Sequence, residues 1–283
     1  MRFINRRTVA AGATALLALA TAGAAWGPAA SAATVTQPTT ADAASVAPPA
    51  TAAAAASKQA DDDEVVVVTR NGLGVITAIT RYEPAGSAER LRAQLRARGI
   101  TGVLNAGEKV ETKQNAVLAC PTYGTAAAWC NHAWAYNGFN DPQVYFLDHT
   151  PAGYPVTNAV ADWYQSPGID AYYRWHTQGC PGGGRHCVHV YAVNSSLSWY
   201  GQTSWAANAP NGPAKVELNT RLLSNTTQRR KTTCHELGHA LGLDHNSSTN
   251  SCLKSGTVGA GWSVRPSSQD FQVLNLLYPR PGT

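Results

Sequence analysis

The stretch HELGHALGLDH, residues 235–245, is the most informative part of this sequence. On an α-helix, His235 and His239 are four residues apart, so both imidazoles project from one face about one turn apart. That spacing suits two neighbouring positions of a tetrahedral zinc ion. Gly242 can adopt the left-handed conformation that ends the helix and reverses the chain, which brings His245 back as the third ligand.

Glu236 follows the first ligand directly and is rotated from it by roughly 100 degrees around the helix. A carboxylate there lies close to the metal without coordinating it. It can take a proton from a zinc-bound water and deliver it to a leaving amine. Three protein ligands leave the fourth position open for water, which is typical of a catalytic zinc site.

Two further sets of residues compete for the metal. Asp244 is an alternative third ligand, but the spacing favours His245, and we interpret Asp244 as a carboxylate that stabilises the loop. The remaining histidines show no comparable spacing, and we interpret them as satisfied polar residues. They are His132, His149, His176, His186 and His189. The last two are three apart in a predicted strand, so they lie on opposite faces.

Residues 235–245 match the pattern H-E-x-x-H-x-x-G-x-x-H, the signature of the metzincin metallopeptidases. The longer run HELGHALGLDHNSS resembles the matrixin branch, the matrix metalloproteinases. Near the end of the chain, PSSQD at residues 266–270, followed by Leu274, Leu277 and Tyr278, is similar to the last helix of matrixin catalytic domains.

The likeness is specific over residues 214–279 and vague over 140–213. It implies an α/β (α+β) catalytic domain with a twisted, mostly parallel sheet of five strands, an active-site helix and a C-terminal helix. It also implies that an edge strand of the sheet pairs with extended substrate. Matrixins use structural zinc and calcium as well; Ca²⁺ is therefore an expectation, but its ligands cannot be placed.

This sequence departs from the matrixin pattern in the turn beneath the metal. The family places a methionine there, and counting from the third ligand puts its position at Leu253. The only methionine of the chain is Met1. A leucine has a similar volume, so the change should cost under about 1.5 kcal/mol. The tyrosine ligand of some other metzincin branches falls on Ser255, so no fifth protein ligand is expected. The matrixin cysteine-switch motif is missing, so any latency must work another way.

The chain divides into four segments. Residues 1–32 have the basic start, apolar run and A-x-A site of a secretory signal peptide, and the alternative is a membrane anchor. Arg6-Arg7 also permits twin-arginine export. Residues 33–60, rich in Ala, Thr and Pro, are expected to be a disordered linker. Residues 61–118 are an N-terminal extension or pro-region, and 119–283 form the catalytic domain.

Hydrophobic patterns and turn signals predict the regular elements. A hairpin is expected around Asn71-Gly72, and a helix is expected to begin after Ser87 and end at Gly99. The predicted strands are residues 65–69, 75–80, 144–147, 186–193 and 215–219; the predicted helices are 88–98, 156–164, 226–241 and 270–277.

All six cysteines lie beyond residue 119, and an even count in an exported protein indicates disulfides. Six cysteines allow fifteen pairings. Proximity in the sequence favours Cys120–Cys130, Cys180–Cys187 and Cys234–Cys252.

These observations predict a secreted, monomeric zinc endopeptidase with one catalytic Zn²⁺ and a protein or peptide substrate. Cleavage after Ala32 removes three arginines and no acidic residue, so the formal charge falls from +5 to +2. Nucleic-acid binding and stable membrane association of the cleaved chain are therefore not expected. Two alternatives stay open: a non-catalytic zinc-binding module, and an exported hydrolase of cell-wall amide bonds.

Overall fold

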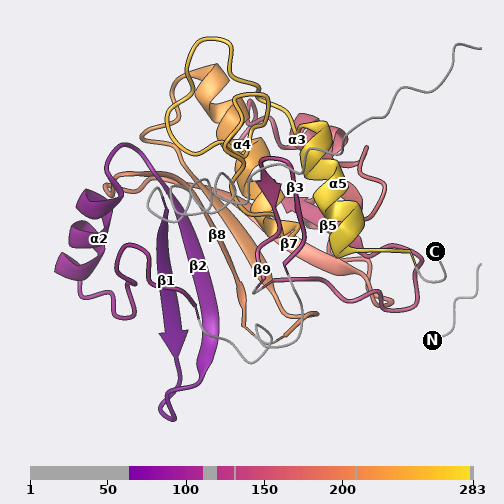
Figure 1. The fold of residues 1–283 in the computed structure, drawn as a ribbon, viewed down its shortest axis with the longest axis horizontal. Coiled ribbons are helices and arrows are strands. Elements are labelled where there is room, and N and C mark those ends of the chain that lie inside the picture. Colours follow the sequence, from indigo (N-terminus) through magenta and orange to yellow (C-terminus); the bar gives the residue numbers. More distant parts are fainter. Residues whose placement is uncertain (1–63, 111–119, 131, 208, 281–283) are drawn as a thin grey trace, which may run out of the picture. The chain divides into compact units, whose positions relative to one another are not determined.

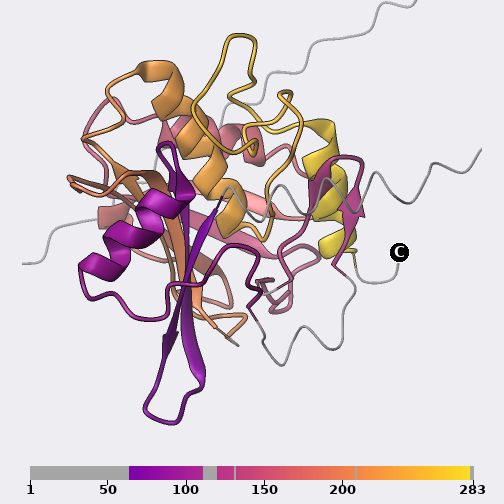
Figure 2. The same ribbon diagram turned by 60° about the vertical axis from the view of Figure 1, so that its left-hand side comes forward.

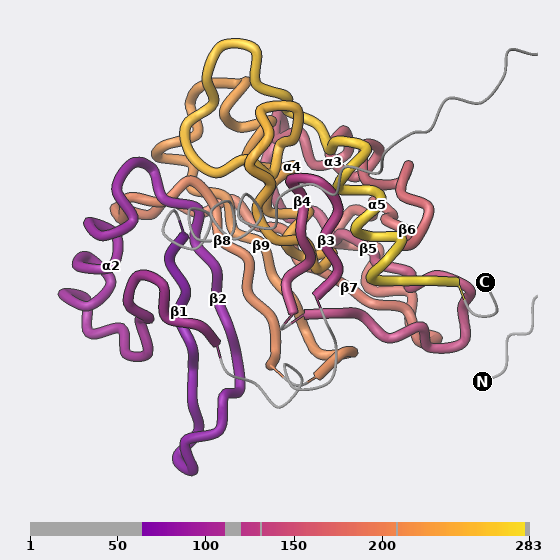
Figure 3. Tube along the Cα trace, in the orientation of Figure 1, coloured from indigo at the N-terminus to yellow at the C-terminus, as the bar shows by residue number. Residues whose placement is uncertain are grey.

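A seven-stranded sheet is the centre of the fold, with strand order β1-β2-β8-β9-β7-β5-β6 (Figures 1 and 3). The computed structural model describes residues 64–110, 120–130, 132–207 and 209–280. All of them belong to one compact unit, residues 48–283. The predicted signal peptide, residues 1–32, and linker, residues 33–60, lie outside the described residues. None of the described helices is long and apolar enough to cross a membrane.

The sheet has a parallel half and an antiparallel half. Strands β9, β7, β5 and β6 pair in parallel, whereas β1, β2, β8 and β9 pair antiparallel. The strands are β1 (Val65–Arg70), β2 (Ile76–Pro84), β5 (Gln143–Asp148), β6 (Asp170–Trp175), β7 (His186–Val193), β8 (Trp199–Ala206) and β9 (Ala214–Asn219). A separate two-stranded sheet joins β3 (Thr122–Tyr123) to β4 (Ala126–Ala127).

The expectation of a mostly parallel sheet of five strands was wrong. Three of the six strand pairings are parallel and three are antiparallel, so the sheet is mixed. Five strands, β8-β9-β7-β5-β6, come from residues 143–219. The other two come from residues 65–84, which form a hairpin and pair with β8. The α/β (α+β) class itself is confirmed.

The strand β2 is the element whose end differs most from its prediction. It was expected to end at residue 80 and instead continues to Pro84. The added residues include Arg81 and Glu83, both almost fully buried. Charged residues normally argue against a buried strand, which is why the sequence pattern appeared to stop.

Two helices pack on the seven-stranded sheet, a third lies against the β3–β4 pair, and a fourth lies next to β1 (Figures 1 and 2). Helix α4 contacts β8, β9 and α3, and its residues 231–240 are all buried. Helix α2 covers Val65 and Val67 of β1 with Leu91 and Leu95. The helices are α2 (Ala88–Ala97), α3 (Val156–Trp163), α4 (Thr226–Ala240) and α5 (Ser268–Leu277), with the short 3-10 helix η2 (His176–Gln178) after β6.

The ends of α4 are fixed by side chain and backbone. Asn225 caps its start and accepts a hydrogen bond from the Gln228 amide at 3.0 Å. Gly242 follows its end with φ of 99°, as predicted. A Cβ there would lie 2.9 Å from the His132 carbonyl oxygen, so both the conformation and the space require glycine.

The three cysteine pairs are those that sequence proximity predicted. Cys120–Cys130 has a Cα–Cα distance of 5.3 Å, and Cys180–Cys187 and Cys234–Cys252 have distances of 6.0 Å. Such pairs form in oxidising compartments. The third pair joins helix α4 to the turn that follows the three candidate ligands.

Candidate metal centre

The three predicted ligands meet at the end of α4. His235 and His239 project from one face of the helix, and the turn after Gly242 returns His245 to them. Their ring centroids are 4.5, 5.1 and 5.0 Å apart. The three side chains are buried and their ligand atoms form a group that could hold a metal ion.

Hydrogen bonds to two of these rings determine which nitrogen carries the proton. His235 Nδ1 lies 2.9 Å from the Cys252 carbonyl oxygen, and His239 Nδ1 lies 2.9 Å from that of Leu243. Because a carbonyl only accepts, each Nδ1 donates, and each neutral ring then presents a lone pair on Nε2. The two Nε2 atoms face each other at 3.0 Å. A cation bound between them would remove this repulsion.

Burial keeps the three imidazoles neutral. It lowers the pKa of His235, holds that of His239 well below its usual value, and lowers that of His245 to about 3. Neither ring nitrogen of His245 has a hydrogen-bond partner among the described residues. An unsatisfied buried polar group is costly, and coordination of a metal would satisfy one of its nitrogens.

The general-base candidate Glu236 points to strand β8. Thr203 Oγ1 donates to Glu236 Oε2 at 2.7 Å, whereas Oε1 has no partner among the described residues. Burial raises the pKa of Glu236 well above its usual value, although the Thr203 hydroxyl opposes the shift. The carboxylate is therefore positioned by one strand residue and kept out of solvent.

Gly201 makes the room that Glu236 occupies. A Cβ at this position would lie 2.4 Å from Glu236 Oε1. Strand β8 has a bulge here, because Glu83 of β2 pairs with Gly201 and Pro84 pairs with Trp199, which leaves Tyr200 unpaired. Sequence reasoning missed β8 altogether, since its run WYGQTSWA has no simple apolar alternation.

The turn beneath the site supports the first ligand. Leu253, which occupies the methionine position of the matrixin pattern, is fully buried, and a Cβ on Gly238 would come within 2.8 Å of its Cδ2. Ser251 Oγ donates to Asp270 Oδ2 at 2.6 Å and accepts from the Leu253 amide at 3.0 Å. These bonds fix the carbonyl of Cys252 that orients His235.

Asp244 contacts the backbone of the third ligand and a buried arginine. Its Oδ1 accepts from the His245 amide at 2.7 Å and from Arg81. Arg81 also pairs with Glu64 and lies over the Trp129 ring at 4.4 Å. Glu64, Asp244 and His245 form a second group that could hold a metal, but the Arg81 guanidinium already pairs with both of its carboxylates.

The residue that sequence reasoning missed at the metal centre is Glu83, near the end of β2. Its Oε2 lies 3.2 Å from His235 Nε2 and 3.6 Å from His245 Nε2, and it accepts from Ser255 Oγ at 3.1 Å. Its Oε1 accepts from Lys231 Nζ at 3.0 Å. No spacing in the sequence links this strand residue to a motif 152 positions later, so only the fold could reveal it.

Neighbouring groups stabilise the negative charge of the buried Glu83 side chain. Its side chain and that of Lys231 are completely inaccessible to solvent. Burial alone disfavours its ionisation, but the adjacent Lys231 ammonium favours it, and the pKa of Glu83 is held well below its usual value. The Gly256 amide adds a hydrogen bond at 2.6 Å. Glu83 is thus an anion aimed at the histidine nitrogens.

The other histidines lie away from this centre. His132 Nε2 donates to the Ala240 carbonyl at 2.9 Å, and His186 Nε2 lies 2.6 Å from the Ala135 carbonyl oxygen. His149 Nε2 and His189 Nδ1 are 2.9 Å apart, and His149 stacks on His176.

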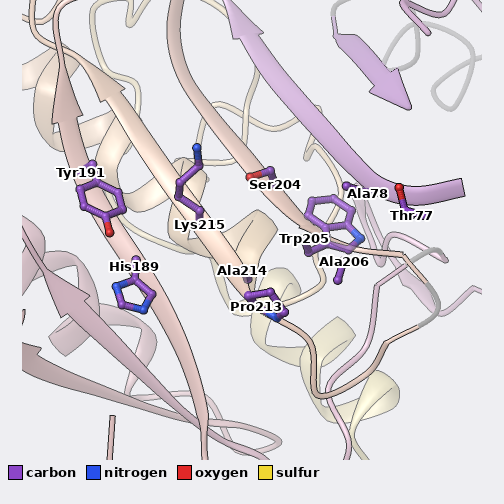
Figure 4. Close-up of a pocket in the computed structure, with 10 residues that line it drawn as sticks. All are labelled: Thr77, Ala78, His189, Tyr191, Ser204, Trp205, Ala206, Pro213, Ala214 and Lys215. Carbon is purple, nitrogen blue, oxygen red and sulfur yellow. The ribbon is translucent and has the colours of Figure 1, made fainter. Parts of the chain in front are cut away.

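A pocket on the sheet does not include the three ligands (Figure 4). Ser204 of β8 and Lys215 of β9 line it, together with His189 and Tyr191 of β7. Ser204 alternates along β8 with Thr203, which contacts α4, so the pocket opens mainly on the opposite face. The metal centre and this pocket are therefore separate features.

The distances among the donor atoms fit a tetrahedral metal site, with zinc as the example. For Zn–N distances of about 2.0–2.1 Å, neighbouring ligands of a tetrahedral site lie about 3.4 Å apart. The separations of 3.0, 3.2 and 3.6 Å bracket this value. No protein-family model and no curated protein matches the chain. The interpretation of the centre therefore depends on its geometry and on the sequence signature.

Proposed function

We propose that this protein is a secreted zinc endopeptidase in which His235, His239 and His245 hold the metal and Glu236 is the general base. One observation carries the proposal: two imidazoles whose Nδ1 atoms donate to carbonyls direct their bare Nε2 atoms at each other, 3.0 Å apart. This is the arrangement by which proteins orient histidines toward a metal ion. Imidazole-only ligand sets suit zinc among the divalent ions.

Glu236 is positioned for proton transfer in peptide hydrolysis. When bound, zinc supplies Lewis-acid polarisation of the scissile carbonyl and makes water acidic. Glu236 takes one proton from the attacking water as the new carbon–oxygen bond forms, and passes it to the amine nitrogen as the carbon–nitrogen bond breaks. Thr203 and the space above Gly201 hold the carboxylate in place for both transfers.

Strand β8 supports a polypeptide substrate. It is the antiparallel outer strand of the group β8-β9-β7-β5-β6, and it runs directly past Glu236. The outer side of β8 pairs with β2 in this structure, and an extended peptide could take that place by backbone hydrogen bonds. Secretion is supported by three disulfides and by the signal-like N-terminus. A monomeric state and a bound Ca²⁺ remain expectations from the sequence.

Cleavage of an unfolded protein tests the proposal. Zinc-loaded wild type and Glu236→Gln, at equal zinc content, are each incubated with a reduced and alkylated protein as substrate. Each of the two proteins is tested in two states: untreated, and after a brief treatment with trypsin that is inhibited before the substrate is added. We expect zinc-dependent cleavage by the wild type in at least one of the two states and by Glu236→Gln in neither. Zinc-loaded wild type that cuts in neither state would contradict the proposal.

A non-catalytic zinc-binding module is the second candidate. The contacts of Glu83 favour it, because a fourth protein ligand closes a zinc site and closed sites are typically structural. Such a module predicts that opening the site by Glu83→Ala produces no peptide cleavage at all. Cleavage of peptidoglycan fragments, with unfolded protein left intact, would instead identify the cell-wall amide hydrolase.

A further inference from the structure

Strand β2 occupies the edge where a substrate would bind. It pairs with β8 antiparallel from Ala78↔Ala206 to Glu83↔Gly201, while β9 pairs with the other edge of β8. Both sides of β8 are thus hydrogen-bonded within the described chain. An extended peptide that uses β8 must first displace residues of β2.

At the end of this strand, the two oxygens of Glu83 have different surroundings. Oε1 is occupied by two donors, Lys231 Nζ at 3.0 Å and the Gly256 amide at 2.6 Å. Oε2 lies 3.2 Å from His235 Nε2 and 3.6 Å from His245 Nε2. Oε1 is therefore fully occupied by donors of the protein, whereas Oε2, which also accepts from Ser255 Oγ at 3.1 Å, faces the candidate metal position.

The contact between Glu83 and His235 is unfavourable as an ordinary hydrogen bond. His235 Nδ1 donates to the Cys252 carbonyl, so its neutral ring has no proton on Nε2 to offer. A carboxylate oxygen and a bare ring nitrogen then face each other across 3.2 Å. Both atoms are ligands that zinc accepts, and a metal ion between them removes the conflict.

Contacts on either side hold β2 in this place. Arg81, two residues before Glu83 and on the same face of the strand, pairs with Asp244 beside the third ligand and with Glu64 at the start of β1. On the opposite face, Tyr82 packs against Trp199, which belongs to the cluster buried under α2. The hairpin and α2 therefore form one support for the Glu83 carboxylate.

We propose that Glu83 is the fourth protein ligand of the metal and that residues 64–110 hold the chain in a closed form, with β2 in the place of the substrate. The inference rests on the proposed peptidase function for its second part only. Glu83 blocks the position that water would otherwise take, and β2 blocks the strand that a peptide would pair with. The open form requires β2 to leave β8 and Glu83 to leave the metal.

The state of the metal can be observed without turnover in the full chain loaded with Co²⁺. The d–d absorption of cobalt reports its ligands, and acetohydroxamate binds only where a coordination position is free. We expect the wild type to show no spectral response to acetohydroxamate. Glu83→Ala should have a changed cobalt spectrum and bind acetohydroxamate at least about tenfold more tightly, because the internal competitor is gone.

The exposed Glu89 on α2 provides the matched control. It belongs to the same segment, and its side chain is 69% exposed. Glu89→Ala should behave as the wild type in both the spectrum and the titration. Glu83→Gln keeps the size of the side chain and removes its charge, so it serves as the second variant if Glu83→Ala does not fold.

The outcomes separate this inference from the proposed function. Acetohydroxamate that binds the cobalt-loaded wild type as tightly as the Glu83 variants would overturn the inference, as would a cobalt spectrum unchanged by Glu83→Ala or Glu83→Gln. A spectral response of the cobalt-loaded wild type to acetohydroxamate would by itself overturn the inference, so folding of the variants is not essential. A variant with an open metal position that cleaves no peptide, even after the brief trypsin treatment described above, would contradict the peptidase function and leave Glu83 as a ligand.

Discussion

Helix α4 and the β2–β8 pair meet at the metal centre and are built in opposite ways. The helix supplies His235 and His239 by a spacing of four residues, and the next turn supplies His245. The strands supply Glu83, Gly201 and Thr203, which reach the helix only through the register of the sheet. The ligands are thus encoded locally, whereas their surroundings depend on contacts between distant segments.

Because of this difference, the residues that would bind the metal lie in the local motif, and the residues that would determine its reactivity lie in the strands. The local motif is sufficient to bring three imidazoles together. The strands decide where the Glu236 carboxylate points and whether the fourth position is occupied. Substitutions in the helix should therefore remove the metal, while substitutions in the strands should leave it bound and change what it can do.

His239→Ala should have the largest effect, because it removes one ligand from the local motif. We expect zinc affinity to fall by at least about a thousandfold, with loss of all hydrolysis. Zinc content after gel filtration in buffer with a weak chelator measures this. His149→Ala, at a partly exposed histidine outside the centre, is the control and should retain one zinc; loss of zinc there as well would place a ligand outside the proposed centre.

Gly201→Ala tests whether the strands position the Glu236 carboxylate. The new Cβ would lie 2.4 Å from Glu236 Oε1, so the carboxylate must move. Displacement of a catalytic group by about 1 Å costs on the order of a hundredfold in rate. We expect that loss in the kcat of the activated protein, with zinc content unchanged. Gly72→Ala, where a Cβ meets nothing within 4 Å, should keep wild-type kcat; equal kcat in both variants would refute the role of Gly201.

His132 joins a distant loop to the end of α4, and its contribution to the free energy of unfolding should depend on pH. Burial lowers its pKa from 6.5 to about 4. Between these values the unfolded chain binds more protons, so the stability that neutral His132 provides is complete above pH 6.5 and is lost as pH falls toward 4. We expect wild type to lose about 2 kcal/mol more than His132→Gln between pH 7 and 4.5.

Urea unfolding of both proteins at the two pH values measures this difference. The three histidines of the candidate metal centre are present in both proteins, so any contribution from them cancels in the comparison. Parallel losses in wild type and His132→Gln would show that His132 is not held neutral by the fold.

Leu253→Met should have the smallest effect. Leu253 is buried beneath the centre without bonding to it through its side chain, and the two side chains have similar volumes. We expect hydrolysis within about tenfold of wild type, with less than about 1.5 kcal/mol of change in the free energy of unfolding. A gain beyond tenfold would mean that leucine impairs the native site.

The sequence predicted most of the elements and the cysteine pairs, since these depend on local patterns. Residues 235–245 placed the three histidines, and Gly242 has the positive φ expected of it. The mixed sheet could not be predicted, because β6 and β8 lack a simple alternation and the hairpin gave no sign of its partner. Glu83 was missed for a physical reason. A charged residue in a strand usually marks an exposed face, and here Lys231, from a segment 148 positions away, makes its burial tolerable.

The bridge Cys234–Cys252 encloses all three histidines in one covalent loop, with a separation of 18 residues between its ends. A loop of this size removes about 3 kcal/mol of conformational freedom from the unfolded chain. Even when α4 has melted, the three imidazoles remain tethered within the ring, so their effective concentration around an ion stays high. In the oxidised chain the three imidazoles therefore stay close to one another before the helix forms, whereas in the reduced chain only folding brings them together.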